Sequence, residues 1–286
     1  MSFWLVQSLN SLALGGLFFL LSAGFSLIFG LMRITNLTHG AYFMLGAYVG
    51  LAVLRARGGF VLAVLAGGAA VMVLGGLVER LVLRRLAGRP LSQVLVTLGI
   101  AFIISDTCLL VWTGDPIPLP IPAMLGGSVR VGSMAFPVYR LAVAGVAIAL
   151  ALGLWALMER TRLGAMVRAG VDDREMARGL GIPVSRLFTG VFCLGSALAG
   201  MGGVLGGPML SVYPGLDTDM LPLALVVVIL GGVGSLPGAI VGSFVVGFVY
   251  TFGQALLPDL AYVVLFVPMV VVLAVRPRGL FGRFAV

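Results

Sequence analysis

Residues 220–258 read MLPLALVVVILGGVGSLPGAIVGSFVVGFVYTFGQALLP, a stretch of 39 residues without a charged side chain. As a single α-helix it would be about 58 Å long, whereas the hydrocarbon core of a bilayer is about 30 Å thick. The stretch must therefore turn once, and the run GGVGSLPG at 231–238 supplies the glycines and the proline that interrupt helical hydrogen bonding. This pattern predicts two membrane-spanning helices joined by a break.

The composition extends this prediction to the whole chain. Of its 286 residues, 60% are hydrophobic and 10% are charged, against about 25% charged residues in soluble domains, and the mean hydropathy is +1.18. Further apolar stretches, each near the length of a bilayer crossing, lie at 1–32, 34–54, 58–78, 90–112, 141–158, 187–216 and 260–275. We therefore predict an all-α, polytopic integral membrane protein with eight to nine transmembrane helices, folded as one transmembrane domain over residues 1–286.

The basic residues predict how these helices are oriented. All 18 are arginines, and most of them lie in three segments, 79–90, 159–187 and 276–283. Basic loops stay on the cytoplasmic side, and the helices predicted between these segments number two and then four, so all three segments fall on one side. The segment 113–140 and the turn containing Asp217 and Asp219 then face outward. The net charge of +8 follows from this asymmetry, so no nucleic-acid partner is expected.

Several residue types are scarce, and this excludes classes of chemistry. The chain has no lysine, which excludes a P-loop and every mechanism that needs a lysine Schiff base. Its one histidine, His39, excludes a multi-histidine metal site. Cys108 and Cys193 lie in apolar runs and are interpreted as small buried hydrophobic residues. We expect no catalytic residues, no metal and no cofactor in this chain.

The longest charged segment, 159–187, reads ERTRLGAMVRAGVDDREMARGLGIPVSRL. Asp172 is expected to cap a short helix that starts at Asp173, with acidic residues at its N-terminal end and arginine further along, as the helix dipole favours. Gly179, Gly181 and Pro183 are expected to end it. The result would be an amphiphilic helix on the cytoplasmic surface. From the residues alone, a merely solvated loop is an equally good interpretation.

Polar residues inside the apolar stretches are the candidates for a translocation pathway. Asn36 and His39, followed by Gly40, could line the pathway or hold an irregular helix start beside it, although Asn36 and Thr38 could equally be plain helix caps. Asp106 is a charge within the fourth stretch, and it could face the pathway, a subunit partner or outer water. The break at 231–238 could be a gate or a plain turn. The pathway candidates are Asn36, His39, Gly40, Asp106, Gly232, Gly234 and Ser235.

Several motifs resemble those of ABC-importer permeases. Glu175-Met176-Ala177, then three residues, then Gly181 is similar to the EAA…G loop of that family. Met176 stands at the second position of the motif, where that loop has alanine. Further motifs resemble the LivH-type permeases of the branched-chain (hydrophobic) amino-acid branch: GLMRITNLTHG at 30–40, MLGAY at 44–48, TLG at 97–99, the break at 231–238 and RPRGLFG at 276–282.

This resemblance implies a function and a set of partners. The segment 159–187 would dock into a groove of an ATPase subunit through Arg168, Asp172, Arg174, Glu175, Ala177, Leu180, Gly181 and Pro183. The partners would be a second homologous permease subunit, two ATPase subunits that hydrolyse the ATP, and a periplasmic substrate-binding protein. The chain itself would be no enzyme, and it would translocate branched-chain or related hydrophobic amino acids across the bacterial inner membrane.

Two alternatives remain open at this point. Permeases for urea and short amides look much like the branched-chain ones. An ion-coupled secondary transporter would instead use Asp106 and His39 as its titrating pair, although the arginine-rich segment has no natural role in that model.

Overall fold

The computed structural model describes residues 2–32, 36–131 and 134–282. Arg33, Ile34 and Thr35 of the motif at 30–40, and Arg283 of the last basic segment, lie outside the described residues. The helices are α1 (Ser2–Met32), α2 (Thr38–Arg55), α3 (Phe60–Leu81), α4 (Pro90–Trp112), α5 (Val138–Arg160), α6 (Arg162–Asp172), α7 (Arg174–Gly179), α8 (Val184–Leu210), α9 (Leu216–Gly231), α10 (Leu236–Leu256) and α11 (Ala261–Val275).

The helices confirm the predicted polytopic membrane fold. In the described part of the chain, α1, α3, α4, α5, α8 and α10 are long and apolar enough to cross a bilayer. The apolar helices α2, α9 and α11 are shorter, with 18, 16 and 15 residues, or about 27, 24 and 22 Å. Together the two groups are compatible with the predicted count of eight to nine crossings.

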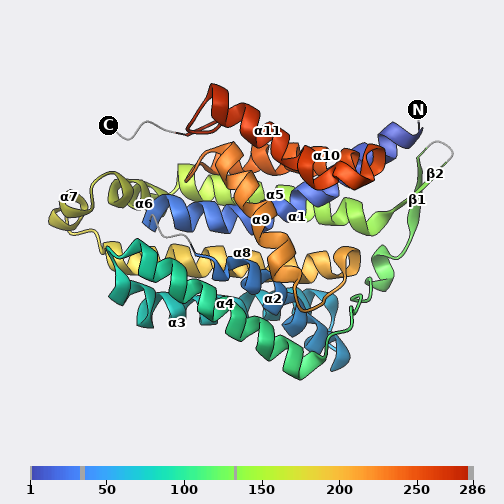
Figure 1. The fold of residues 1–286 in the computed structure, drawn as a ribbon. Helices are drawn as coiled ribbons and strands as arrows, with labels where there is room; N and C mark the ends of the chain where they lie inside the picture. Colours follow the sequence, from blue (N-terminus) through green and yellow to red (C-terminus); the bar gives the residue numbers. More distant parts are fainter. Residues whose placement is uncertain (1, 33–35, 132–133, 283–286) are drawn as a thin grey trace.

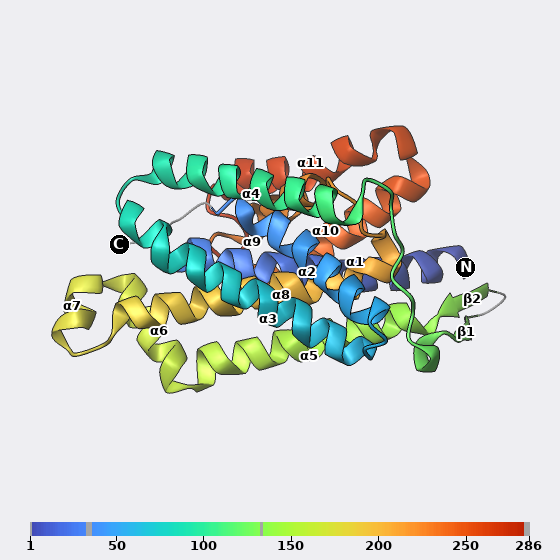
Figure 2. The same ribbon diagram turned by 90° about the horizontal axis from the view of Figure 1, so that it is seen from below.

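The two ends of the helix bundle differ in what they carry (Figures 1 and 2). One end holds α6, α7 and the last described residues, and the other holds the N-terminus and a hairpin of β1 (Ser128–Val131) and β2 (Met134–Pro137). At the first end Arg84 donates to the carbonyl oxygen of Ser185 at 3.3 Å, and Leu280 N donates to Leu230 O at 2.9 Å. The segments 79–90, 159–187 and 276–282 therefore share this end, which we call the arginine-rich end.

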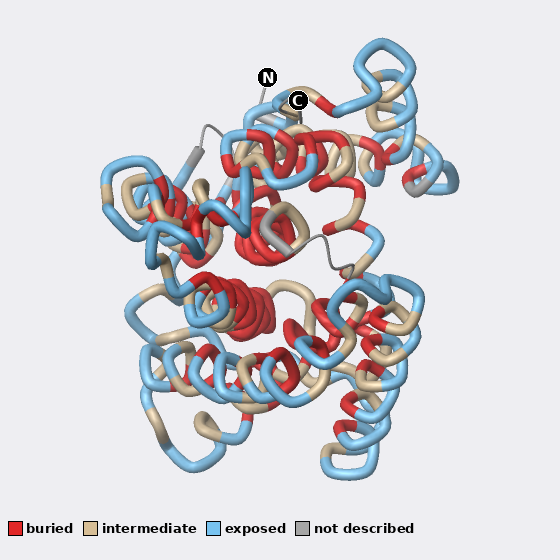
Figure 3. Tube along the Cα trace, turned by 90° about the vertical axis from the view of Figure 1, so that its left-hand side faces the viewer, coloured by how far each residue is buried: buried red, intermediate tan, exposed pale blue. Residues whose placement is uncertain are grey.

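Of the six long apolar helices, α1 and α8 are the most buried, and Figure 3 shows the buried residues gathered in the interior of the bundle. Both helices are rich in glycine at their contacts. A Cβ atom on Gly24 would lie 2.3 Å from Gly195 O, and one on Gly203 would lie 1.9 Å from Phe43 O. Helix backbones thus touch without intervening side chains, as small residues permit in membrane proteins.

The predicted turn in 220–258 is present, because α9 ends at Gly231 and α10 begins at Leu236. Gly232 and Gly234 have φ values of +99° and +75°, a region that favours glycine. Ser235 caps α10 by accepting a hydrogen bond from Gly238 N at 3.1 Å. The turn lies at the arginine-rich end, where a Cβ on Gly234 would be 2.7 Å from the Cα atom of Gly30.

One expectation about local structure is wrong, and one segment contains an element that was not predicted. Asp172 does not cap the short helix: it is the last residue of α6, and Asp173 is the cap of α7, which starts at Arg174. The segment 113–140, which was predicted to face outward, contains the antiparallel pair β1–β2, in register from Ser128↔Pro137 to Val131↔Met134.

Candidate functional site

Helix α6 leaves the bundle at the arginine-rich end and is fixed at its start. Thr161 caps it by accepting a hydrogen bond from Gly164 N at 3.2 Å. Arg168, predicted as a coupling residue, forms an ion pair with Glu159 at 3.6 Å and donates to the carbonyl oxygen of Met158. Gly164 packs so closely that an added Cβ would lie 1.9 Å from that same carbonyl. The connection between α5 and α6 is therefore well defined.

Helix α7 is short, with six residues, and has a strong N-terminal cap. Asp173 Oδ1 accepts hydrogen bonds from Glu175 N and Met176 N, both at 2.9 Å. The helix ends at Gly179, and Gly181 follows with a φ of +81°. Ala177 is 2% exposed and packs with Val184 and Phe188 of α8. Local sequence thus sets both ends of α7. Ala177 attaches it to α8, and so does the Arg174 guanidinium, which lies 4.6 Å from the centre of the Phe188 ring.

The remaining surface of this segment is unusually apolar for a charged loop. Met176 is 63% exposed and Leu180, just beyond the helix, is 73% exposed. The two residues are four positions apart, so they lie on the same side of the turn. The other predicted coupling residues that are exposed are Asp172, Arg174, Glu175, Gly181 and Pro183. An exposed pair of large apolar side chains at a mostly charged end is typical of a contact surface for a partner.

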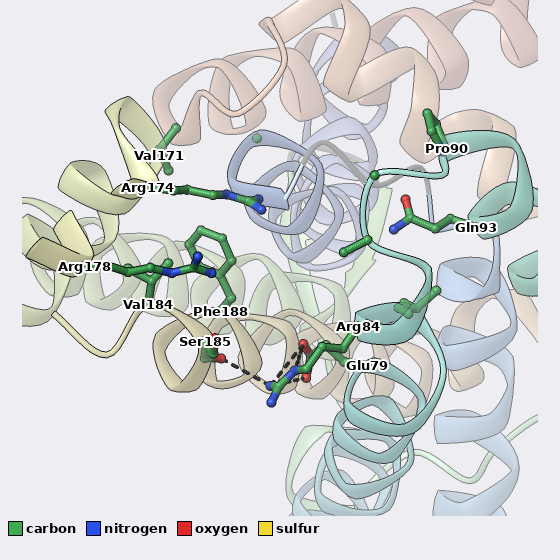
Figure 4. Close-up of a pocket in the computed structure, with 14 residues that line it drawn as sticks. Glu79, Arg84, Pro90, Gln93, Val171, Arg174, Arg178, Val184, Ser185 and Phe188 are labelled. Carbon is green, nitrogen blue, oxygen red and sulfur yellow. Dashed lines mark hydrogen bonds and ion pairs between the residues drawn. The ribbon is translucent and has the colours of Figure 1, made fainter. Parts of the chain in front are cut away.

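A pocket of about 500 Å³ lies between this segment and the α3–α4 connection (Figure 4). One of its lining residues, Glu79, has a buried carboxylate that was not predicted from the sequence. Glu79 has a side chain that is 3% exposed, and it pairs with Arg84 at 3.1 Å and accepts a hydrogen bond from Thr189 at 2.8 Å. The sequence could have indicated the ion pair, because Glu79 is an acidic residue five positions before Arg84. Nothing in the sequence indicated the contact with Thr189 on α8.

The predicted pathway residues near the start of α2 lie together and are fully buried. Asn36 Oδ1 accepts from Thr38 N at 3.1 Å, and the Thr38 hydroxyl donates to Thr97 O at 2.9 Å. His39 Nε2 lies 2.8 Å from the carbonyl oxygen of Leu21, in the middle of α1, so Nε2 carries the proton of this bond. These contacts hold an irregular helix start deep inside the bundle. Gly40 belongs here too, since a Cβ on it would lie 2.5 Å from Asp217 O.

The other pathway candidates lie elsewhere. Asp106 is exposed on α4, whereas His39 is fully buried, so the two do not share an environment as a titrating pair would. Gly232, Gly234 and Ser235 lie at the α9–α10 turn near Gly30. The seven candidates therefore occupy three separate places: the start of α2 for Asn36, His39 and Gly40, the exposed side of α4 for Asp106, and the α9–α10 turn for Gly232, Gly234 and Ser235.

Comparison with known proteins decides the family. The model of the family described as branched-chain amino acid transport system / permease component matches residues 7–273. The chain belongs to this family. As a permease of this family it is a transport subunit of an ABC importer, not an enzyme, and it acts with ATPase and binding-protein partners.

Individual relatives of the permease cover from 80% to 98% of its length. The high-affinity branched-chain amino acid transport system permease protein BraD of Pseudomonas aeruginosa is 28% identical over 98% of this chain and 96% of its own. LivH of Escherichia coli, of the same description, is 27% identical with the same coverage. A probable branched-chain amino acid transport permease protein LivH of Methanocaldococcus jannaschii is 28% identical over 80% of this chain and 74% of its own. No solved structure matches the permease.

Proposed function

We propose that this permease carries branched-chain or closely related hydrophobic amino acids across the bacterial inner membrane. Relatives named for branched-chain amino acids support this substrate over urea or short amides. A zwitterion needs dipoles rather than full charges along its path, and the apolar, glycine-rich helices of this chain suit an aliphatic side chain. The chain would pair with a second homologous permease subunit, two ATPase subunits and a periplasmic binding protein.

The observation that carries the mechanism is the exposed pair Met176 and Leu180 at the arginine-rich end. We assign this end to the cytoplasm, where the ATPase subunits would bind α6 and α7. Asp172, Arg174, Glu175, Gly181 and Pro183 would complete the docking surface. The half-buried Arg168 and the buried Ala177 would position it, because their contacts are within the chain. Closure of the ATPases would then move α7 and, through Ala177, α8.

The pathway role of Asn36, His39 and Gly40 would be indirect. Hydrogen bonds of Thr38 and His39 hold the start of α2 against Thr97 and Leu21. The group would therefore fix the position of the first half of α2, which begins deep in the membrane. Gly232, Gly234 and Ser235 would permit movement at the inner end of α9. Asp106 would face the second permease subunit or the outer surface.

The double variant Met176→Ala/Leu180→Ala tests this proposal. The complete importer is reconstituted in liposomes, and ATP-dependent uptake of labelled leucine is measured beside that of labelled urea. Each apolar side chain lost from the centre of an interface costs about 1–2 kcal/mol, so ATPase binding and leucine uptake should fall about tenfold or more. The fold should be unaffected because both side chains are exposed in the isolated chain.

The matched control is Val61→Ala, which shortens the side chain of a residue that is 73% exposed at the opposite end of α3. It should leave uptake unchanged. Full uptake by the double variant would show that the ATPases dock elsewhere, and transport of urea in preference to leucine would reject the substrate assignment.

A further inference from the structure

Two of the short helices, α2 and α9, begin at the same place inside the bundle. A Cβ on Gly40, in the first turn of α2, would lie 2.5 Å from the backbone oxygen of Asp217, in the first turn of α9. Gly40 follows His39, which is bound to Leu21 in the middle of α1. About 21 Å of helix separates Asp217 from the other end of α9. Asp217 therefore lies among the helices, well away from the arginine-rich end.

The carboxylate of Asp217 is buried without a full set of partners. The residue is 7% exposed, and the backbone N–H groups of Gly215 and Thr218 lie near its carboxylate. Its Oδ1 atom is buried and has no hydrogen-bond partner among the described residues, and they place no arginine in an ion pair with it. A buried carboxylate in this state is costly, so it calls for a functional explanation.

The surroundings of this carboxylate are apolar or neutral. The thiol of Cys108 on α4 is close enough for electrostatic interaction with Asp217, and it has the same relation to the hydroxyl of Tyr48 on α2. Tyr48 stacks on Trp112, with ring centres 4.9 Å apart. Cys108 and Leu216 belong to one buried hydrophobic cluster. Helices α2, α4 and α9 therefore surround a single carboxylate with apolar and neutral side chains.

This combination selects the kind of ligand. A metal ion is a poor match, because it needs several ligand atoms, and the part of the chain that the structure describes has no group of three His, Cys, Asp or Glu side chains that could hold one. A primary ammonium is a good match. It forms a charge-assisted hydrogen bond with one carboxylate and accepts aromatic neighbours.

The start of α9 offers the opposite pole beside the carboxylate. The N-terminal end of a helix carries a partial positive charge, and Gly215, which precedes α9, gives it no side-chain cap. Asp217 and this helix end thus present a negative and a positive pole side by side. The pair acts as a dipole rather than as an isolated charge, and it matches the two poles of a zwitterion.

We propose that the Asp217 carboxylate binds the α-ammonium of the transported amino acid as it passes between α2, α4 and α9. This inference rests on the proposed function and adds to it the contact that distinguishes an α-amino acid from urea, which has no ammonium. In this structure Oδ1 is closed off from solvent, so the ligand reaches it when these helices separate during transport.

The test measures binding to the permease assembled with its ATPase subunits and purified in detergent. The substrate-binding protein is left out because it would bind the amino acid itself. Labelled leucine is displaced with leucine, with leucinamide, which keeps the ammonium, or with isocaproate, which has hydrogen in its place. The wild type should prefer leucine and leucinamide to isocaproate about tenfold or more, as expected for a hydrogen bond between charged groups. In Asp217→Asn this preference should disappear, with the affinity for isocaproate unchanged.

Two further variants separate the ammonium contact from general effects. Asp219→Asn removes an exposed carboxylate of the same helical turn, and it should bind as the wild type does. Asp217→Glu keeps the charge and should keep the preference for leucine over isocaproate. Thermal unfolding without ligand gives an independent measurement. Asp217→Asn should be no less stable than the wild type, because it removes a buried charge that has no ionic partner.

An unchanged preference for the ammonium in Asp217→Asn would overturn the inference. If that variant were also less stable than the wild type, Asp217 would be a helix cap. Stabilisation of the wild type by sodium ions without any binding of leucine would overturn the inference in favour of an ion site. Leucine uptake by the complete wild-type importer is measured alongside. Uptake together with an unchanged preference rejects the Asp217 contact alone, whereas absence of uptake rejects the proposed function.

Discussion

Glu79 carries an asymmetric ion pair at the end of α3. Its side chain is 3% exposed, whereas the side chain of its partner Arg84 is 40% exposed. When a pair of this kind is broken, the cost depends on which charge stays behind, because a charge left in a buried place has no water to solvate it. Glu79 also accepts from Thr189, so this carboxylate joins α3 to α8 beside the α7 attachment.

This asymmetry gives a prediction for single and double variants. Arg84→Ala leaves the buried carboxylate with one hydroxyl donor and should destabilise the fold by about 2–3 kcal/mol. Glu79→Ala leaves an arginine that can turn to water and should cost about 1 kcal/mol. Thermal unfolding in detergent measures both. A Glu79→Gln/Arg84→Met variant should be more stable than Arg84→Ala, and the reverse order of the two single variants would contradict the account.

For the candidate site residues, the sequence predicted which ones would lie together better than it predicted what each of them contacts. Asn36 and His39 stood out because they are polar residues in an apolar stretch, and they do form one buried group. Their partners, the carbonyl of Leu21 and the backbone of Thr97, are backbone groups that no side-chain pattern marks. Glu79 was overlooked because it adjoins an arginine-rich loop and reads there as an ordinary solvated acid.

Glycine contacts between helices decide the arrangement of elements in this bundle. Gly46 of α2 and Gly200 of α8 meet so closely that a Cβ on Gly46 would lie 2.3 Å from Gly200 O. Gly203 makes a similar contact with the backbone of α2 at Phe43. In a lipid environment no hydrophobic effect drives helices together, so close backbone packing has to supply the attraction.

Gly203→Ala should therefore prevent correct assembly of α2 on α8. The added Cβ would lie 1.9 Å from Phe43 O, and a backbone carbonyl cannot move aside as a flexible side chain can. We expect loss of the monodisperse protein in fluorescence-detected size-exclusion chromatography. The matched control Gly145→Ala on α5 has no atom within 4 Å of the new Cβ and should be folded. Normal assembly of Gly203→Ala would show that the contact is not a close backbone approach.

Element boundaries were predictable where chemistry changes abruptly. The predicted stretch 90–112 has the same first and last residues as α4. Pro90 fits the first turn of a helix, and the apolar run ends at Trp112. The choice between Asp172 and Asp173 as cap was not predictable, since both side chains can accept the same hydrogen bonds. The β1–β2 hairpin was not predicted because each strand has four residues. That is too few to recognise the alternation of apolar and polar side chains that is typical of a strand.

At the scale of the molecule, the positions of the arginines distinguish one end of the helix bundle from the other. Pairs of distant residues confirm that the three basic segments share an end, as Arg84 with Ser185 does. At the opposite end, Phe60 packs against Tyr139 with ring centres 5.9 Å apart, and Ile117 bridges to Val212. The sequence predicted this arrangement because charge placement and the number of crossings are independent constraints that agree. It could not predict which helices are central, since the hydropathy of α1 and α8 lies within the range of the other long apolar helices.

The polarity predicts which residues an impermeant thiol reagent reaches in intact cells. In a variant with Cys108 and Cys193 replaced by alanine, Arg130→Cys on β1 should be labelled from outside. Arg178→Cys on α7 should be labelled only after the membrane is opened. Both arginines are exposed, so access depends on the side of the membrane alone. Labelling of both from outside would mean an even number of crossings between them and would contradict the assignment.

Residues 280 and 281 are bound to the α9–α10 turn by hydrogen bonds from Leu280 N to Leu230 O and from Phe281 N to Gly231 O. Both acceptors are backbone carbonyl groups in the last turn of α9, where no further helical residue is present to donate to them. Residues 280 and 281 thus serve as a C-cap that a distant segment supplies, and a variant that lacks them would leave these two carbonyl groups unpaired.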